Sequence, residues 1–281
     1  MNRNRTLAVI VALAFFALPL AAQTAQTTQQ YQPSVGQEGK DVIWVPTPEA
    51  LVQAMLDLAK LTPSDYLIDL GSGDGRIVIA AAKRGTRALG VEFNPDMVEL
   101  SRQNAAKEGV SDKATFVRGD IFEADFSSAT VLTMYLLPSL NMRLRPQILQ
   151  MKPGTRVVTH AFTMEDWEPD QTVSAEERNA YLWIVPANVA GVWTWRGPSG
   201  DVELTLRQTF QKVEGTLKSG GQQLAIQNAK LAGDRISFSV GADPLATQEY
   251  SGRVTGENIE GITKAVNRAG VKWAAKHRVA Q

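Results

Sequence analysis

The stretch YLIDLGSGDGRIVIAAAKRGTRALGVE, residues 66–92, decides how the first half of this chain folds. It begins with an apolar run, Tyr66–Leu70, typical of a strand. It then passes through a glycine-rich turn into residues 76–84, which are typical of a helix. A second apolar run ends in an acid, Glu92. A strand that turns through glycines directly into a helix leaves backbone N–H groups free at the carboxyl edge of a parallel sheet, where nucleotides bind. The stretch therefore predicts a strand–helix–strand unit with a nucleotide crevice.

The spacing of the glycines separates two kinds of nucleotide chemistry. The dinucleotide fingerprint G-x-G-x-x-G, counted from Gly71, requires a glycine where this chain has Arg76, and the last glycine comes one residue earlier, at Gly75. The pattern G-x-x-x-x-G-K-[ST] is absent, which excludes a P-loop. By itself the turn leaves open a tight connection that binds no ligand. The run DLGSGDG, residues 69–75, resembles the first motif of class I S-adenosylmethionine (SAM)-dependent methyltransferases.

The residues around this stretch continue the alternation of strands and helices. Asn94 followed by Pro95 predicts the start of a helix that runs to about residue 107. Thr47, as N-cap before Pro48, predicts a leading helix in the same way. Only six strands are predicted, one fewer than the resemblance implies, so we expect the end of the domain to be abbreviated. The other predicted strands are residues 114–117, 129–134, 155–160 and 181–185, with a further helix from Pro138 to about residue 151.

A narrower resemblance rests on the turn DLGSGDGR, residues 69–76. Residues 66–120 resemble the SAM site of bacterial relatives of the Dot1-like and FAM173-type protein lysine methyltransferases, and the likeness covers roughly residues 45–186. It implies an α/β Rossmann-like class I methyltransferase domain. In that family the glycine turn approaches the methionine part of SAM, the acid after the second strand holds the ribose, and the acid after the third strand, with the apolar residue that follows it, holds the adenine. The cofactor-binding residues implied here are Asp69, Gly71, Ser72, Gly73, Asp74, Gly75, Glu92, Phe93, Asp120 and Ile121.

The residues after the fourth and fifth strands are candidates for the acceptor side. We expect Tyr135 to lie near the methyl acceptor as the catalytic residue, through a polar contact or through its ring face beside the cationic sulfonium. Packing of this ring on the next helix fits its position equally well. His160 is a candidate base, against the alternative of a structural histidine with a backbone partner. The loop LLPS, residues 136–139, differs from the NPPY of amino-group methylases that act on bases, which favours a protein lysine or a small molecule over nucleic acid.

From residue 191 the sequence changes to short apolar segments separated by Gly-rich turns. Residues 202–207 alternate with period two, as expected for a half-buried strand. We predict a small antiparallel all-β domain, a barrel or a sandwich, over residues 191–281, with a binding or docking role. Trp193, Trp195 and Trp273 are expected in its core. The predicted strands are residues 192–195, 202–210, 213–217, 224–229, 235–240, 249–254, 259–263 and 271–275.

The first 45 residues have the composition of a targeting segment and a leader. Arg3 and Arg5 precede the apolar residues 7–20 and then two alanines, the pattern of a secretory signal peptide over residues 1–22. It predicts a periplasmic or secreted protein that meets the membrane only during export; anchoring in the cytoplasmic membrane is the lesser alternative, because a span needs roughly 20 apolar residues. Residues 23–45 are expected to be a flexible leader and residues 46–190 the methyltransferase domain. Export conflicts with a cofactor that is made in the cytoplasm.

Composition removes several classes of function. Lys plus Arg and Asp plus Glu number 29 each, so no strong positive field attracts nucleic acid. The absence of cysteine and the presence of only two histidines exclude disulfides and cysteine nucleophiles and argue against a metal site. The favoured interpretation is a SAM-dependent methyltransferase with an unidentified acceptor. The alternatives are an exported methyltransferase fold without catalytic activity and, more distantly, a nicotinamide enzyme.

Overall fold

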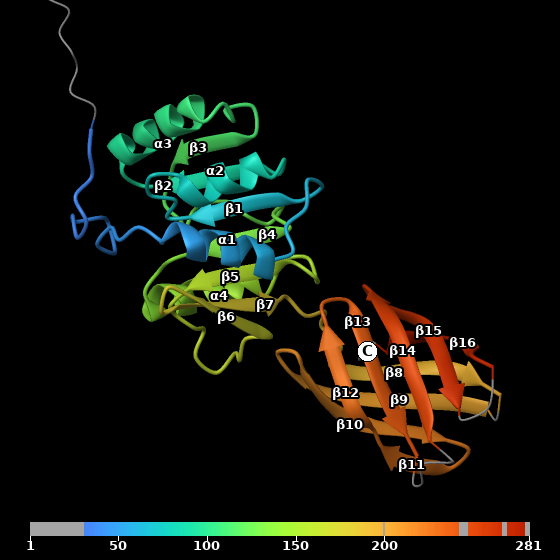
Figure 1. Cartoon of the computed structure of the whole chain (residues 1–281). Helices are drawn as coiled ribbons and strands as arrows, with labels where there is room; N and C mark the ends of the chain where they lie inside the picture. The colour runs from blue at the N-terminus through green and yellow to red at the C-terminus, as the bar shows by residue number, and fades with distance from the viewer. Residues whose placement is uncertain (1–30, 199, 242–246, 266–268, 279–281) are drawn as a thin grey trace, which may run out of the picture. The chain divides into compact units, whose positions relative to one another are not determined.

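The computed structural model describes residues 31–198, 200–241, 247–265 and 269–278. The predicted signal peptide, residues 1–22, lies outside this part of the chain. The described strands form two sheets, a seven-stranded mixed sheet and a nine-stranded antiparallel sheet (Figure 1). No helix in the described ranges is both long and apolar enough to cross a membrane.

The first sheet consists of β1 (Tyr66–Leu70), β2 (Arg87–Glu92), β3 (Ala114–Arg118), β4 (Val131–Met134), β5 (Arg156–His160), β6 (Gln171–Ala175) and β7 (Arg178–Ile184). Their order across the sheet is β3-β2-β1-β4-β5-β7-β6. The strands β3, β2, β1, β4 and β5 are parallel, whereas β6 and β7 form an antiparallel hairpin beside β5. The carboxyl ends of five strands therefore meet at one edge of the sheet.

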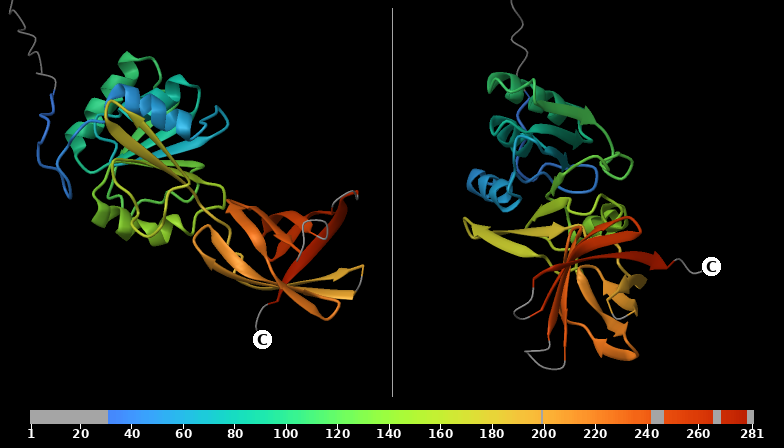
Figure 2. Two further views of the ribbon diagram at one scale, coloured as in Figure 1. Left: turned by 60° about the horizontal axis from the view of Figure 1, so that its bottom comes forward. Right: turned by 90° about the vertical axis from the view of Figure 1, so that its right-hand side faces the viewer.

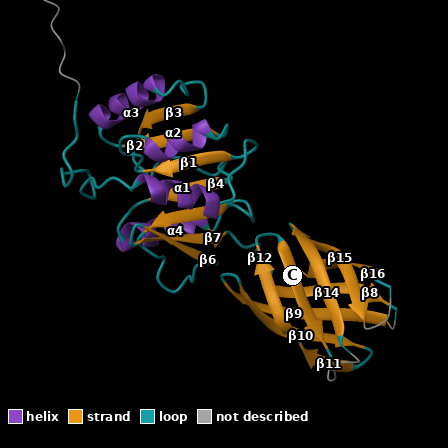
Figure 3. Ribbon diagram, viewed as in Figure 1, coloured by secondary structure: helices purple, strands orange, loops and turns teal. Residues whose placement is uncertain are grey.

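Helices cover both faces of this sheet (Figure 3). They are α1 (Glu49–Leu58), α2 (Arg76–Lys83), α3 (Pro95–Lys107) and α4 (Pro138–Ile148). Successive side chains of a strand point to opposite faces, and on β1 Leu67 joins the apolar cluster of α1, α2 and α3, whereas Ile68 joins that of α4. Both side chains are buried, so the sheet is apolar on both faces, as parallel sheets covered by helices are.

The prediction of six strands and an abbreviated domain was wrong, because β6 supplies a seventh strand. This strand reads QTVSA, and its side chains are exposed or half-buried, so neither an apolar run nor a clear alternation marks it in the sequence. It lies at the edge of the sheet and pairs with β7 over five residues. Backbone pairing rather than side-chain burial makes it a strand.

The two predicted helix starts had different outcomes. Asn94 caps α3, because its side chain accepts hydrogen bonds from the N–H groups of Asp96 and Met97 at 2.9 and 3.4 Å. The N-cap prediction for Thr47 was wrong: α1 begins one residue later than expected, and its N-cap is Pro48, which has no capping side chain. The hydroxyl of Thr47 has a different partner, described with the site below.

The second sheet consists of β8 (Gly191–Gly197), β9 (Gly200–Thr209), β10 (Lys212–Ser219), β11 (Gln222–Ala225), β12 (Gln227–Ala232), β13 (Arg235–Val240), β14 (Gln248–Thr255), β15 (Asn258–Ala265) and β16 (Val271–Arg278). Neighbouring strands are antiparallel, and β16 pairs with β8. The predicted strand 224–229 is split at Ile226: β11 pairs with β10 and β12 with β13. One stretch of chain thus joins both ends of the sheet, which makes it a nearly closed barrel rather than a sandwich (Figure 2).

Aromatic and aliphatic side chains form the core of this barrel. Trp193 and Trp273 are buried, and the ring of Phe238 stacks on that of Tyr250 with centroids 4.8 Å apart. Trp195 packs on the same cluster, 5.0 Å from Trp273 between ring centroids. The prediction of core positions is confirmed for Trp193 and Trp273, while Trp195 is half-buried and packs against that core.

Candidate functional site

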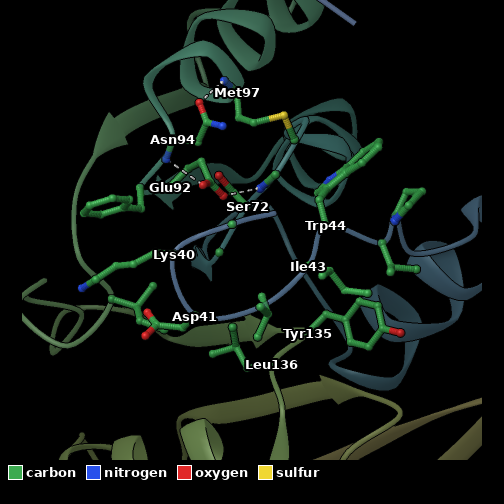
Figure 4. A pocket seen from close by; sticks show the side chains of 18 of the residues that line it. Lys40, Asp41, Ile43, Trp44, Ser72, Glu92, Asn94, Met97, Tyr135 and Leu136 are labelled. Carbon is green, nitrogen blue, oxygen red and sulfur yellow. Dashed lines mark hydrogen bonds between the residues drawn. The ribbon is translucent and has the colours of Figure 1, made fainter. Parts of the chain in front are cut away.

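The carboxyl ends of the parallel strands surround a cavity of about 310 Å³. Loops that follow neighbouring parallel strands lie side by side, so residues from β1 to β5 meet there. Every predicted cofactor residue except Gly75 lines the cavity, and so does Tyr135. Residues 37–47, which precede α1 and are termed the leading segment, line it as well; Figure 4 shows side chains from this segment and from the strand ends around the same space.

The turn after β1 needs its glycines for two different reasons. Gly71, Gly73 and Gly75 have φ of +77°, +54° and +82°, a conformation that other residues adopt at a cost. Gly75 in addition has no room for a side chain: a Cβ there would lie 2.7 Å from the ring of Phe116 and 2.9 Å from the Cβ of Ser101. Gly75 therefore allows the start of α2 to pack closely against β3 and α3, while Gly71 and Gly73 bring backbone to the cavity.

Helix α3 holds the turn from the side away from the cavity. Ser101 donates a hydrogen bond from Oγ to the carbonyl of Gly73 at 2.8 Å, and Asn104 donates from Nδ2 to the carbonyl of Asp74 at 3.0 Å. The Asp74 carboxylate pairs with the Arg76 guanidinium at 2.6 Å. Side chains of α3 thus hold the backbone of the turn, and Arg76 of α2 holds its Asp74 side chain.

Two polar side chains are buried at this turn. Asp69 is 2% exposed and accepts a hydrogen bond from Thr133 Oγ1 at 2.7 Å. Burial raises the pKa of Asp69 to about 7. Ser72 packs over Gly90, where a Cβ would lie 2.5 Å from its Oγ, and this hydroxyl has no hydrogen-bond partner among the described residues. A buried hydroxyl without a hydrogen-bond partner costs about 1–3 kcal/mol of stability. The hydroxyl of Ser72 is therefore available to form a hydrogen bond with a ligand.

Glu92 is held by both of its carboxylate oxygens. Oε2 accepts a hydrogen bond from the N–H of Gly73 and Oε1 accepts one from the N–H of Asn94, each at 2.9 Å (Figure 4). The carboxylate at the end of β2 is therefore fixed against the glycine turn, at the cavity wall.

Asp120, in the loop after β3, forms an ion pair with Lys40 of the leading segment and accepts a hydrogen bond from the N–H of Phe122 at 3.0 Å. The bond from Lys40 is the main cause that lowers the pKa of Asp120. The Lys40 Nζ also lies 5.0 Å from the centroid of the Phe93 ring, which is 42% exposed. Ile121 is buried and forms the adjoining wall.

The leading segment and the residue before it, Gly36, form a loop that lies against the glycine turn. The N–H of Gly36 donates to the carbonyl of Trp44 at 2.8 Å, which closes a loop. The indole of Trp44 packs on Gly73, where a Cβ would lie 2.7 Å from its Nε1. The sequence assigns residues 23–45 to a leader, yet residues 37–45 form part of the cavity wall.

Tyr135 follows β4, and its ring stacks on that of His160 with centroids 3.7 Å apart and planes inclined by 29°. The ring of Phe162 lies 6.1 Å from that of Tyr135. His160 is fully buried, and its Nδ1 lies 3.0 Å from the hydroxyl of Thr47. Burial, with a smaller contribution from Arg178, lowers the pKa of His160 to about 4. The structure therefore does not support His160 as a base, and its partner is a hydroxyl rather than the backbone.

Several residues that shape the site have weak signals in the sequence. Lys40 lies in a polar stretch and Trp44 in the short apolar run of residues 42–45, but neither pattern shows that this segment folds back onto the sheet. Ser101 is buried although it is polar, and its one signal is its spacing of four residues from Met97 on the apolar face of α3. Within the described ranges, no group of His, Asp and Glu side chains is arranged to hold a metal ion.

Known proteins resemble the half of the chain that contains the cavity. A family model described as the ANTKMT methyltransferase domain matches residues 69–171. The protein-lysine N-methyltransferase of Saccharolobus islandicus (strain REY15A) is 43% identical over 151 residues, which are 51% of this chain and 94% of that protein. The adenine nucleotide translocase lysine N-methyltransferase of Mus musculus is 36% identical over 142 residues, 50% of this chain and 61% of that protein. The chain thus spans nearly all of the first relative and about three fifths of the second.

A solved structure resembles the chain to a similar extent. The RNA methyltransferase from Salinibacter ruber, in complex with S-adenosyl-L-homocysteine, is 51% identical and matches 52% of this chain and 96% of that chain, with a TM-score of 0.50. The names of these relatives agree on methyl transfer and differ in the acceptor, which is a lysine in two of them and RNA in the third.

Proposed function

The chain belongs to the family of class I SAM-dependent methyltransferases that includes the Saccharolobus protein-lysine N-methyltransferase, and from this premise we propose that its methyl acceptor is the side-chain amine of a protein lysine. One observation carries the proposal. The residues that line the cavity after β4 and β5 are apolar or aromatic: Tyr135, Leu136, Leu137, Leu140 and Phe162. Such walls suit the aliphatic stem of a lysine, which buries its methylenes and keeps its amine at the tip.

The residues at the cavity fit SAM, the cofactor of this family. A hydroxyl without a partner among the described residues, Ser72 Oγ, lies at the turn beside the two cavity-lining glycines. Glu92 offers a fixed carboxylate for the ribose hydroxyls, and Asp120 with the buried Ile121 offers a polar and an apolar contact for the adenine. SAM, when bound, supplies a methyl group activated by a sulfonium. Gly71, Ser72 and Gly73 would lie against its methionine part.

Methyl transfer to an amine needs a free lone pair placed in line with the transferred methyl group. A lysine amine, with an ordinary pKa of about 10.4, is protonated in water, and apolar surroundings favour its neutral form. The walls formed by Tyr135 and Phe162 supply such surroundings. His160 plays no part in proton removal, because its pKa is about 4 and its ring is buried outside the cavity lining. We therefore expect the amine to lose its proton to water as it enters.

The experiment uses the purified full chain with SAM that carries an isotopically labelled methyl group. Cell-envelope protein, soluble protein and total RNA are offered as separate acceptors, and peptides and nucleosides are analysed by mass spectrometry. Labelled methyl-lysine supports the proposal. Label confined to RNA nucleosides would give this chain the acceptor class named for the Salinibacter relative and would overturn it. Binding of S-adenosyl-L-homocysteine without any transfer would favour the inactive fold.

A matched pair of variants tests the cofactor site itself. Glu92→Gln removes the charge that would face the ribose, while Glu99→Gln makes the same change at an exposed position on α3. A hydrogen bond to a charged group contributes about 1.5–3 kcal/mol, so calorimetry with S-adenosyl-L-homocysteine should show a loss of affinity of roughly 10- to 150-fold for Glu92→Gln. Glu99→Gln should bind like the wild type. Equal affinity of the wild type, Glu92→Gln and Glu99→Gln would show that Glu92 does not bind the ribose.

We also propose that residues 1–22 direct the chain across the cytoplasmic membrane, so that the enzyme works in the periplasm or outside the cell. The basic residues, the apolar run and the small residues that end it support this destination. Fractionation of cells that express the full chain, with mass spectrometry of its N-terminus, tests the proposal. A full-length protein that starts at Met1 and stays in the cytoplasm would contradict it.

A further inference from the structure

Three side chains from distant parts of the sequence are in contact beside the acceptor walls. The ring of Tyr135, which lines the cavity, lies on the ring of His160, which does not line it. At the edge of the imidazole, the hydroxyl of Thr47 meets Nδ1 of His160 at 3.0 Å. Thr47 and His160 are 4% and 0% exposed, so the contact is shielded from water. The order is Thr47, His160, Tyr135, from the leading segment to the cavity wall.

Thr47 is fixed by its backbone as well as by its hydroxyl. Its carbonyl accepts a hydrogen bond from Nη1 of Arg76 at 2.8 Å, and Arg76 in turn pairs with Asp74 of the glycine turn. Thr47 also lines the cavity. One residue thus connects the leading segment to the cofactor turn through its carbonyl and to the acceptor wall through its hydroxyl.

The imidazole of His160 has a single described partner. Its Nε2 is buried and makes no hydrogen bond with the described residues, so the hydroxyl of Thr47 is the one described hydrogen-bond partner that holds the ring. A neutral ring that is buried and held at one nitrogen is a rigid surface for Tyr135. Its low pKa, caused by burial and by Arg178, keeps it uncharged, so the stack does not change with protonation near neutral pH.

We propose that Thr47 and His160 are positioning residues that set the orientation of the Tyr135 ring, and through it the path of the acceptor amine. This inference rests on the proposed function, because it assigns Tyr135 to the acceptor side. Methyl transfer depends steeply on alignment of the lone pair with the methyl carbon, so a small rotation of this ring lowers kcat. Cofactor affinity depends on the glycine turn, Glu92 and Asp120, so we expect it to remain unchanged when the contact between Thr47 and His160 is removed.

The main variant is Thr47→Val, which keeps the branched shape and removes the hydroxyl. Its control is Thr86→Val, because Thr86 is also fully buried and donates its hydroxyl to a backbone carbonyl, that of Thr62, at 2.9 Å, outside the cavity lining. We expect Thr47→Val to lower kcat on the order of tenfold. The affinity for S-adenosyl-L-homocysteine should remain within about twofold of the wild type. Thr86→Val should change the melting temperature and leave kcat as it is.

A spectroscopic readout accompanies the kinetics. The ¹⁵N shifts of His160 report its tautomer, and the ring-proton shifts of Tyr135 report the stacking at 3.7 Å. Thr47→Val should move the ¹⁵N resonances of His160, because it removes the hydrogen bond at Nδ1, and should move the Tyr135 resonances, whereas Thr86→Val should leave both unchanged. An active wild type in which Thr47→Val matches Thr86→Val in kcat and in both spectra would overturn the inference.

Failure of the proposed function has a different signature. If the wild type transfers no methyl group to any lysine, the acceptor proposal fails, and the spectra alone decide whether Thr47 sets the ring. Unchanged Tyr135 resonances in Thr47→Val then refute the positioning role. His160→Phe serves as a second variant: it keeps a ring for stacking and removes the bond to Thr47. It should reproduce the loss of kcat, and full activity in that variant would contradict the role of the hydrogen bond.

Discussion

The methyltransferase domain buries several polar side chains at the carboxyl edge of its sheet, whereas the described part of the barrel buries mainly aromatic and aliphatic groups. Asp69, Ser72, Thr133 and His160 are all buried around the cavity, and the hydroxyl of Ser72 and the Nε2 of His160 make no hydrogen bond among the described residues. The polar residues buried in the described barrel are Ser239 and Thr263, and both make hydrogen bonds. Asn141 Oδ1 and Trp167 Nε1 of the methyltransferase domain also have no described partner, but of these four unsatisfied residues Ser72 is the one that lines the cavity. Because an unsatisfied group costs stability, Ser72 marks a position shaped for a ligand.

Equivalent glycine substitutions in the two domains test this comparison most strongly. Gly75 and Gly221 have nearly the same φ, +82° and +81°, but a Cβ would meet Phe116 and Ser101 at Gly75 and no atom within 4 Å at Gly221. Alanine in this conformation costs about 1–2 kcal/mol at either site. Overpacking adds about 1–3 kcal/mol at Gly75 alone. Urea unfolding should therefore show Gly75→Ala destabilised by about 2–5 kcal/mol and Gly221→Ala by about 1–2 kcal/mol.

Cofactor binding provides a second measurement that separates the two glycine variants. Gly75→Ala should also weaken binding of S-adenosyl-L-homocysteine, since it moves the turn that lines the cavity, and Gly221→Ala should not. Equal destabilisation of the two variants would contradict the assignment of Gly75 to close packing.

The next prediction separates two buried groups of the methyltransferase domain by pH. The folded pKa of Asp69, about 7, exceeds its ordinary value of 3.8, so this group stabilises the fold at low pH and loses that effect as the pH rises through 7. The folded pKa of His160, about 4, is below its ordinary 6.5, so this group favours the fold above pH 6.5, and the effect is lost as the pH falls towards 4. Between pH 4 and 7 the two contributions oppose each other.

Removing either group should reveal the other. Relative to the wild type, Asp69→Asn should lose stability on acidification from pH 7 to 4.5, and His160→Phe should gain it, each by at most about 1.4 kcal/mol per pH unit. Urea unfolding at four pH values measures both slopes without cofactor. In the described barrel, burial shifts the pKa of Tyr250 upward from 10, outside this range. Parallel curves for the three proteins would show that neither group is shifted.

The smallest expected effect concerns the ion pair between Lys40 and Asp120. Its members are partly exposed, and surface ion pairs of this kind contribute little to stability. If Asp120 receives the adenine amino group, Lys40 competes for the same carboxylate, and Lys40→Gln should tighten binding of S-adenosyl-L-homocysteine by up to about fivefold at low salt. The difference should vanish in about 1 M salt. Arg278→Gln, which breaks the barrel pair with Glu203, serves as the control and should have no effect. Weaker binding in Lys40→Gln would mean that Lys40 contacts the cofactor.

The sequence predicts what depends on local patterns. The turn after β1 and the acids Glu92 and Asp120 follow from strand ends and glycine spacing, because parallel strands bring their carboxyl ends together whatever the rest of the chain does. Asn94 was predicted as a cap for the same local reason. The barrel was predicted from its regular turns, and it took the structure to separate a barrel from a sandwich.

The sequence could not reveal what depends on distant partners. Thr47 is a residue type that often caps helices and lies where an N-cap is expected, but its hydroxyl bonds to His160, which is distant in the sequence. The strand β6 is a strand because its backbone pairs with β7, and its sequence has no apolar pattern that predicts it. The break at Ile226 accompanies a shift in register between Gln227 and Lys230, where Asn228 has φ of +54°, and nothing in the flanking residues demands it.

The contact between Thr47 and His160 joins residues 113 positions apart. At a synthesis rate of roughly 5–20 residues per second, His160 is added to the chain about 6–23 s after Thr47. Until then Trp44 and Lys40 have no cavity to cover, and the cofactor has no complete pocket to enter. Folding of the glycine turn can come early, from local contacts, while completion of the binding site belongs to the last steps, after β5 has joined the sheet.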